Sequence, residues 1–357
     1  MKVVFRVDSS SKVGSGHLMR CLTFAQQLKK EKNAEVYFLM RNLEGNLIDL
    51  VNANGFTSYV LPRMEDNISL HGYEEWLTVS QKLDAEQSIN IIKVIGDIDL
   101  IIIDSYAIDI LWEKQIRPFV KQIMVIDDLA NRKHDCDILL DQNLYEDILT
   151  RYDGLVPSTC KMCLGPQYVL LREEFYNAKR NLRERDGSIN DILIFFGGVD
   201  ATNETEKTLQ AIELLELEDV TVNVVVGNSN VYKDKIKEHC AVHENWHYYC
   251  QVNNMAELMA KADFAIGAGG TTTWERCFLG LPAIVVAVAE NQIEVAEVCA
   301  SRGIVLYLGT SAVVTVSSIK NTFKILTTNK ISAMSNNCKE LMRDGNGIQK
   351  LFEDCCI

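Results

Sequence analysis

The sequence predicts an α/β protein built from two doubly wound, Rossmann-like domains, each with a parallel sheet. Short apolar runs alternate with helix-like stretches along most of the chain, which is typical of βαβ units. The alternation occurs twice, on either side of a charged stretch at 179–190. The chain has 357 residues, which exceeds the usual size of a domain with a single hydrophobic core. Each half is therefore expected to bury a core of its own.

The first half opens on an apolar run and continues through repeated strand and helix patterns. Apolar runs of this length fit strands that are covered on both faces, and the longer stretches between them fit helices. Strands are expected at 3–5, 35–40, 57–61, 99–104, 122–126 and 136–140, and helices at 17–30, 45–54, 79–94 and 109–119.

The second half repeats the same alternation. Strands are expected at 191–196, 221–226, 246–249, 263–266, 283–286 and 305–308, and helices at 204–215, 232–240, 255–261, 272–278 and 292–302. The stretch 179–190 between the halves is dense in charge and ends in Gly187-Ser188, which indicates a solvated connector. We therefore expect domains at 1–178 and 191–357 with a ligand cleft between them, and the last helix can pack back on the first domain.

Composition excludes several classes of partner. A formal net charge of −13 argues against nucleic acid or an anionic membrane surface. Arg6 and Asp8 interrupt the first apolar run before a signal peptide could form, and no run reaches membrane-spanning length. The eleven cysteines are odd in number and lie mostly in apolar stretches, which fits reduced thiols. We expect a cytoplasmic monomer without nucleic-acid or membrane partners.

The sequence predicts no metal site. Cys160 and Cys163 are a spaced pair, but a zinc site would need a second pair or suitably spaced histidines. The other histidines show no convincing ligand spacing and are expected to be mostly surface groups: His71, His134, His239, His243 and His247.

The most informative segment is the first glycine-rich turn. Gly14-Ser15-Gly16 follows the first strand and leads to His17 at the start of a helix. Such a turn lies at the carboxyl edge of a parallel sheet, where open α/β folds bind ligands. The positive end of the helix disfavours imidazolium, so His17 is expected to be a neutral general base. The alternative is that His17 only caps the helix or packs.

Two more glycine-rich edges lie in the second half. Gly197-Gly198 leaves a strand, with Thr202-Asn203 available to cap the next helix; it is either an anion or sugar contact or a plain turn. The second of these edges is the stronger candidate for a ligand site. Its backbone N–H groups and hydroxyls can hold a diphosphate, while a glutamate accepts hydrogen bonds from the ribose hydroxyls. Its alternative is helix capping by the threonines, with the acid at the positive helix end. Its residues are Gly269, Gly270, Thr271, Thr272 and Glu275.

Other phosphate-binding motifs are missing. No Gly-x-x-x-x-Gly-Lys-Ser/Thr occurs, which argues against a P-loop. Met19 stands where a dinucleotide fingerprint has its third glycine. No cofactor is therefore expected.

A set of motifs, in order along most of the chain, resembles the nucleotide-sugar hydrolase family of pseudaminic acid biosynthesis and, more distantly, the two-domain GT-B glycosyltransferases. The motifs are Arg6 with Asp8, Gly14 to Leu22, Asp104-Ser105-Tyr106, Ile126-Asp127-Asp128, Leu139 to Asn143, Gly165 to Phe175, and Phe196 to Asp200. The resemblance implies a GT-B-like fold and removal of UDP from UDP-2,4-diacetamido-2,4,6-trideoxy-β-L-altropyranose.

The resemblance also assigns roles to single residues. His17 corresponds to the proposed base, in the first domain, and would activate a water that attacks the anomeric carbon with inversion and without metal. Gly269, Gly270, Thr272 and Glu275 correspond to the UDP-binding loop of the second domain. Tyr106 would line the sugar pocket, and Ser105 stands where family members often have histidine, so any role of that histidine is lost. The remaining expected substrate contacts are Asp8, Gly14, Gly16, Arg20, Gly197, Gly198, Thr271, Asn291 and Gln292.

Three functions stay open from the sequence. The first is the hydrolase, whose partner is its nucleotide-sugar substrate; the others are a GT-B glycosyltransferase that uses a UDP-amino sugar, and a non-catalytic binding module. Ligand contacts by Asp127 and Asp128 are also left open, because paired acids at a strand end are often solvated or capping. Arg172 and Glu173 either contact the ligand or pair with each other on the interdomain surface.

Overall fold

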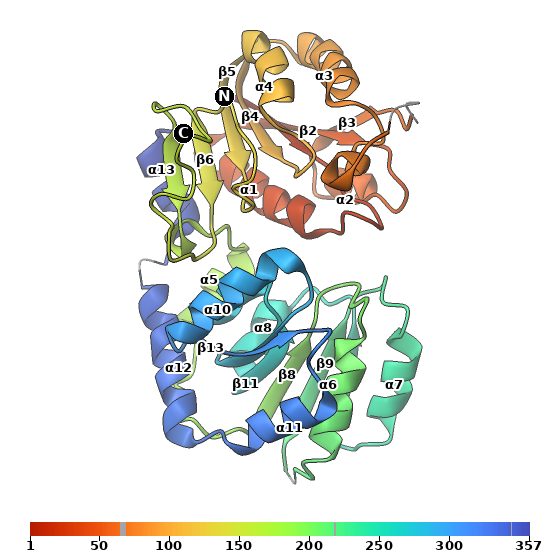
Figure 1. Cartoon of the computed structure of the whole chain (residues 1–357), viewed down its shortest axis with the longest axis vertical. Helices are drawn as coiled ribbons and strands as arrows, with labels where there is room; N and C mark the ends of the chain where they lie inside the picture. The colour runs from red at the N-terminus through yellow and green to blue at the C-terminus, as the bar shows by residue number, and fades with distance from the viewer. Residues whose placement is uncertain (65–68, 218, 344) are drawn as a thin grey trace. The chain divides into compact units, whose positions relative to one another are not determined.

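The computed structural model describes residues 1–64, 69–217, 219–343 and 345–357. The chain divides into two compact units (Figure 1). The first unit is Met1–Asn143, Asp147–Leu170 and Asn346–Ile357, and the second is Leu144–Glu146 and Leu171–Gly345.

The first unit is built on a seven-stranded parallel sheet in the order β3-β2-β1-β4-β5-β6-β7. In the register of its centre, Phe5 of β1 lies between Phe38 of β2 and Ile102 of β4. The strands are β1 Lys2–Val7, β2 Glu35–Arg41, β3 Thr57–Leu61, β4 Ile98–Asp104, β5 Val120–Ile126, β6 Ile138–Asp141 and β7 Lys161–Leu164.

Helices cover both faces of this sheet because successive strand side chains point to opposite sides. Val3, Phe5 and Val7 pack in the core under α1, whereas Val4 packs in the core under α3 and α4. Figure 1 shows α3 and α4 on one side of the sheet and α1 on the other. The helices are α1 Gly16–Lys32, α2 Ile48–Ala53, η1 Gly72–Trp76, α3 Gln81–Ile95, α4 Ile110–Ile116, η2 Arg117–Phe119 and η3 Pro166–Tyr168.

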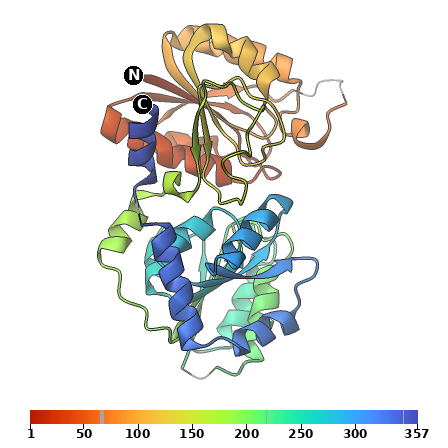
Figure 2. The same cartoon turned by 60° about the vertical axis from the view of Figure 1, so that its left-hand side comes forward.

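The last helix, α13 (Gly347–Cys355), belongs to the first unit. The ring of Phe352 stacks on that of Phe24 in α1, with centroids 5.9 Å apart, and Figure 2 shows the two helices side by side. A Cβ on Gly347 would lie 2.4 Å from the carbonyl oxygen of Val169. Only glycine therefore allows the start of α13 to approach the chain this closely.

The second unit has a six-stranded parallel sheet in the order β10-β9-β8-β11-β12-β13. Its strands are β8 Asp191–Phe195, β9 Thr221–Val226, β10 Trp246–Cys250, β11 Phe264–Ala268, β12 Ala283–Ala287 and β13 Val305–Thr310. Its helices are α5 Glu173–Arg180, α6 Glu204–Glu213, α7 Lys233–Ala241, α8 Met255–Lys261, α9 Thr272–Phe278, η4 Glu290–Gln292, α10 Ile293–Ser301, α11 Val316–Lys324 and α12 Thr328–Leu341. The predicted fold class of two doubly wound parallel-sheet domains is confirmed; the cleft between them stays a prediction.

Several features differ from the expectations, and α11 and α12 were not among the expected helices. β7 was missed because its Lys161 and Met162 are exposed, so it lacks the apolar run of a central strand. The first domain was expected to reach 178, yet α5 lies in the second unit, where Tyr176 packs edge-on against Phe278 at 5.1 Å. The stretch 179–190 is not fully solvated, because the guanidinium of Arg185 is buried and donates to the carbonyls of Ala262 and Leu279 at 2.8 and 2.6 Å.

Among the described residues, no helix has both the length and the apolar character that crossing a membrane would require.

Candidate active site

The first glycine-rich turn leaves open space at the start of α1. Gly14 donates to the carbonyl of Ser10 at 2.8 Å and has φ +80°, a conformation that favours glycine. Apart from the adjoining chain, no atom of the described residues lies within 4 Å of where a Cβ on Gly14 or Gly16 would stand. A ligand could therefore approach the backbone here, as the sequence predicts.

His17 is held by a buried carboxylate. Its Nδ1 lies 2.5 Å from Oδ1 of Asp104, the last residue of β4. Arg20, one helical turn after His17, donates to both oxygens of the same carboxylate at 2.6 Å. Burial alone would raise the pKa of Asp104, but Arg20 and His17 hold it well below its usual range. An ionised carboxylate can only accept, so the proton of a neutral His17 lies on Nδ1 and its lone pair on Nε2.

Tyr106 and Asp128 continue this arrangement. The hydroxyl of Tyr106 donates to Asp128 at 2.5 Å, and the tyrosine ring meets the His17 ring edge-on, with centroids 4.7 Å apart. Burial and the charge of Asp128 raise the pKa of Tyr106 well above its usual value. Arg20 also lies 3.5 Å from Asp128. Tyr106 is therefore neutral. Arg20 is buried between the carboxylates of Asp104 and Asp128, and its contact with a substrate stays a prediction.

An aromatic wall adjoins His17. Trp76, at the end of η1, stacks on Tyr106 with ring centroids 5.4 Å apart and meets His17 edge-on at 5.9 Å. Tyr73 of η1 lies 5.0 Å from the Tyr106 ring. No signal in the sequence points to this role, because η1 has no apolar periodicity and Trp76 resembles a packing residue. Trp112, in contrast, is buried in the core of the first unit and donates to Asp84 at 2.8 Å.

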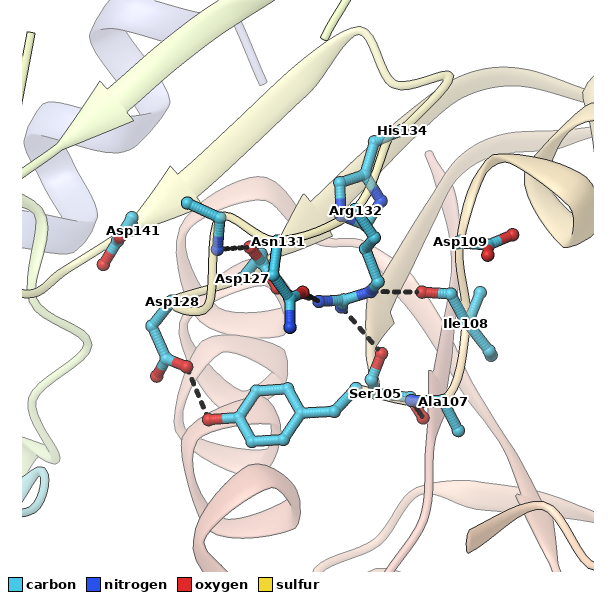
Figure 3. A network of polar contacts seen from close by, with 12 residues as sticks. Ser105, Ala107, Ile108, Asp109, Asp127, Asp128, Asn131, Arg132, His134 and Asp141 are labelled. Carbon is cyan, nitrogen blue, oxygen red and sulfur yellow. Dashed lines mark hydrogen bonds and ion pairs between the residues drawn. The ribbon is translucent and has the colours of Figure 1, made fainter. Parts of the chain in front are cut away.

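Asp127 and Asp128, which the sequence could not separate, have different surroundings. Asp127 accepts from the backbone of Ala130 at 2.9 Å and pairs with Arg132 at 2.7 Å. Arg132 in turn donates to the carbonyls of Ser105 and Ile108, so it ties the loop after β5 to the loop after β4 (Figure 3). Asp127 therefore supports the loops, and Asp128 alone contacts the predicted site residues.

Asp8, an expected substrate contact, is instead part of the core. It is 4% exposed, accepts from the backbone N–H of Arg41 at 2.6 Å, and pairs with Arg6 at 2.7 Å. Asp84 of α3 binds both arginines. The alternation along β1 turns Arg6 toward α3, and Asp8 follows it into this buried ion network.

The stronger glycine loop of the second unit follows β11. Gln292 braces it, because Oε1 accepts from the backbone of Gly269 at 3.2 Å and of Val288 at 3.1 Å. Gln292 thus takes up one N–H group that was expected to face phosphate. Among the described residues, Thr271 makes no side-chain cap on α9, so the capping alternative lacks support. Asn291 is half-buried beside Gln292 in η4.

Glu275 lies one turn into α9, and its side chain is 15% exposed. Arg172 donates to Oε1 at 3.1 Å and also pairs with Glu174. Burial raises the pKa of Glu275, although Arg172 acts in the opposite direction. Thr272 accepts weakly from Arg276 at 3.4 Å. Arg172 thus contacts a predicted ligand residue, which the sequence had left open.

Gly197 and Gly198 form an open turn after β8. Gly197 has φ +88°, and apart from the neighbouring residues in the chain no atom of the described residues lies within 4 Å of a Cβ built at either position. The following helix is capped by Asp200, which accepts from the backbone of Glu204 and Thr205 at 2.9 and 3.0 Å. The expected capping by Thr202-Asn203 is therefore wrong: Asp200 reaches the N–H groups of α6 first.

The spaced cysteines of the first unit have separate thiol neighbours. The Cys160 thiol lies 3.6 Å from Cys136, and the Cys163 thiol lies 3.0 Å from Cys355. The fold therefore directs Cys160 and Cys163 to different partners.

His134, expected at the surface, is instead buried. Its Nδ1 lies 2.6 Å from the carboxylate of Glu113, which is buried as well. The partner comes from α4, 21 residues earlier in the chain, so the sequence around His134 carries no sign of this pairing.

Comparisons with known proteins add sequence relatives. Residues 192–350 match the family model "Glycosyltransferase family 28 C-terminal domain". The chain is 30% identical over 307 residues to the UDP-2,4-diacetamido-2,4,6-trideoxy-β-L-altropyranose hydrolase of Campylobacter jejuni, covering 85% of this chain and 97% of that protein. It is also 30% identical over 302 residues to an uncharacterized protein of Methanocaldococcus jannaschii, covering 82% of this chain but only 57% of that longer protein.

Solved structures show the fold. MurG of Acinetobacter baumannii matches with a TM-score of 0.65 and 14% identity, over 99% of this chain and 98% of that one. A UDP-glucosyltransferase from Polygonum tinctorium matches with a TM-score of 0.68 and 12% identity, over 100% and 98%. The GT-B-like fold class is thereby confirmed, and at these identities the likeness extends no further.

Proposed function

The chain belongs to the family of the UDP-2,4-diacetamido-2,4,6-trideoxy-β-L-altropyranose hydrolase, and from this premise we propose that it is a nucleotide-sugar hydrolase of pseudaminic acid biosynthesis. The reaction releases UDP from a UDP-linked diacetamido-trideoxy hexose, with water as the acceptor.

The observation that supports this proposal most is the pairing of His17 with Asp104. A base that activates water must present an unprotonated nitrogen and must be stabilised once it is protonated. The carboxylate at Nδ1 meets both needs, as it does in the Ser-His-Asp triad. His17 lies at the start of α1, which follows β1, and Asp104 is the last residue of β4. Because β1 and β4 pair in parallel, their carboxyl ends lie at the same edge of the sheet, and this brings the two residues together.

In the proposed reaction, Nε2 of His17 takes a proton from water as the water oxygen bonds to the anomeric carbon. The bond between that carbon and the diphosphate oxygen breaks, and its electron pair leaves with UDP. A single displacement of this kind inverts the anomeric configuration. Asp104 and Arg20 position the base, and Tyr106 with Trp76 offers ring faces to the sugar.

The UDP half of the substrate is assigned to the second unit. The loop after β11 offers the backbone of Gly270 and the hydroxyl groups of Thr271 and Thr272 to the diphosphate. Glu275, which Arg172 orients, accepts hydrogen bonds from the ribose hydroxyls. Gly197 and Gly198 leave room for a further contact. Because these groups can stabilise the leaving diphosphate, the proposal requires no metal ion.

The decisive experiment follows UDP release and the product anomer by NMR with a panel of UDP-linked diacetamido sugars. We expect the wild type to release UDP with inversion and His17→Gln to lose activity while it keeps its affinity for UDP. His247→Gln is the matched control, because His247 is an exposed histidine on β10. Retention of configuration, or full activity of His17→Gln, would contradict the mechanism.

A second candidate function is glycosyl transfer, which the match to the family 28 C-terminal domain favours. The same assay distinguishes it, because a transferase would release UDP substantially faster when an acceptor is added. A binding module would bind UDP and release none from the sugar conjugate.

A further inference from the structure

Three side chains with metal-ligating atoms meet where α6 and α7 end in the second unit. Glu213 is the last residue of α6, His239 lies in the last turn of α7, and His243 follows that helix. The carboxylate of Glu213 lies 3.7 Å from Nε2 of His239 and 3.5 Å from Nε2 of His243. One ligand atom from each residue lies within 4.8 Å of the other two. Spacing along the chain does not predict this cluster, because the carboxylate comes from another helix.

His239 is oriented by a second carboxylate. Its Nδ1 lies 3.3 Å from Oε2 of Glu206, which precedes Glu213 on α6. Metal-binding histidines usually donate their other ring N–H to a carboxylate, which fixes the tautomer and leaves the ligating nitrogen free. Glu206 thus turns the lone pair of Nε2 toward Glu213.

His243 presents a buried nitrogen. Its Nε2 is shielded from solvent and has no hydrogen-bond partner among the described residues, although it faces Glu213. Its ring stacks on Trp246, with centroids 3.9 Å apart and planes at 22°. A buried polar atom without a hydrogen bond is costly, and a metal ion at this position would satisfy it.

We propose that Glu213, His239 and His243 bind a Zn²⁺-type divalent cation. Ligand atoms of a tetrahedral zinc site stand roughly 3.3 Å apart. Oε2 of Glu213 lies 3.7 Å from Nε2 of His239, its Oε1 lies 3.5 Å from Nε2 of His243, and a single oxygen of Glu213 lies within 4.8 Å of a ring nitrogen of each histidine. Glu213 is 50% exposed, so water can reach the fourth position. Two imidazoles and one carboxylate suit zinc or a similar transition metal, whereas Mg²⁺ and Ca²⁺ take oxygen ligands.

The site is separate in position from the glycine loops of the same unit. In a parallel sheet each helix runs back against its strand, so the ends of α6 and α7 lie at the amino edge of the sheet, and the loops after β8 and β11 lie at its carboxyl edge. The cation would fasten α6 to α7, which lie side by side in Figure 1. We therefore assign it a stabilising role, independent of UDP release.

Calorimetric titration of the chelator-treated, chemically reduced 357-residue chain with ZnCl₂ tests the proposal. Thiolates are zinc ligands as well, and Cys250 is a free, exposed cysteine, so the test is the difference between variants. We expect His243→Gln to lose one binding event, and Glu206→Gln to bind at that site about 10–100-fold more weakly. His247→Gln is the control and should bind as the wild type does.

Two further measurements distinguish this site from zinc held by thiolates. Co²⁺ bound at this site should give a visible spectrum without the charge-transfer band of a cobalt–thiolate bond. Zn²⁺, but not Mg²⁺, should raise the thermal midpoint of the wild type and of His247→Gln more than that of His243→Gln. Equal zinc stoichiometry and affinity in wild type and His243→Gln would overturn the proposal. If His243→Gln fails to fold, either of two other results would overturn the proposal. One is equal zinc affinity of the wild type and Glu206→Gln, and the other is a wild-type thermal midpoint that Zn²⁺ does not change.

Discussion

Replacing Asp104 by asparagine tests the idea that this carboxylate makes His17 a base. Asp104 accepts three short contacts, one from Nδ1 of His17 at 2.5 Å and two from Arg20 at 2.6 Å. An amide offers one acceptor oxygen, and its NH₂ group would face a donor. The imidazole can relieve that conflict by moving its proton to Nε2, the atom that should accept the proton from water.

The size of the effect follows from these contacts. A hydrogen bond to a charged group contributes about 1.5–3 kcal/mol, and the substitution also removes the charge that stabilises imidazolium as it forms. A combined loss of about 4 kcal/mol corresponds to a fall in kcat of about 10³-fold. The equivalent substitution in the Ser-His-Asp triad lowers kcat about 10⁴-fold, so the value is of the expected order.

The assay measures kcat for UDP release together with UDP affinity and the thermal midpoint. Asp127→Asn is the matched control, because Asp127 is a buried carboxylate paired with Arg132 at the same sheet edge. We expect it to lower stability without a comparable fall in kcat. A folded Asp104→Asn with kcat within about tenfold of the wild type would refute the reasoning.

Three other perturbations follow from the structure. Burial and the charge of Asp128 raise the pKa of Asp141 to about 8. The protonated Asp141 therefore stabilises the folded state fully below the unfolded pKa of 3.8, and this stabilisation is lost as pH rises through 8. Urea denaturation should show that the free energy of unfolding of Asp141→Asn, relative to wild type, rises between pH 6 and about pH 9, and a constant difference would contradict this. A Cβ at position 269 would lie only 3.3 Å from Val285, so Gly269→Val crowds the loop with branched atoms. UDP affinity measured by calorimetry should fall at least about tenfold, roughly 1.4 kcal/mol. Unchanged affinity would show that this loop is not part of the UDP site. Arg185→Met removes a buried guanidinium that donates hydrogen bonds to several backbone carbonyls. Thermal unfolding should show that the free energy of unfolding falls by about 3 kcal/mol, while UDP affinity is retained. An unchanged thermal midpoint would show that these hydrogen bonds add no net stability.

The sequence predicted the elements whose signal is local. Buried central strands such as 99–104 are continuous apolar runs, because a parallel sheet covers them on both faces, and β4 is found at Ile98–Asp104. The glycine turn before His17 could be placed for the same reason, since a positive φ and a helix start are decided within a few residues. The edge strand β7 and the charged helix α5 carry weaker local patterns and were missed.

The partners of the site residues could not be read from the sequence in the same way. Asp104 is 87 residues from His17, and only the pairing of β1 with β4 brings them together. Asp8 is near His17 in the sequence, yet the side-chain alternation of β1 and the charge of Arg6 direct it into the core.

The sequence by itself thus determined most of the strands and helices along the chain, the positions of the glycine-rich loops and the family resemblance. The tertiary structure alone decided which carboxylate orients His17, that Gln292 braces the second loop, and that Glu213 meets His239 at the end of α7 and His243 just after it. The reason is physical: backbone conformation depends mainly on neighbours along the chain, whereas charge pairing and burial depend on residues that only folding makes neighbours.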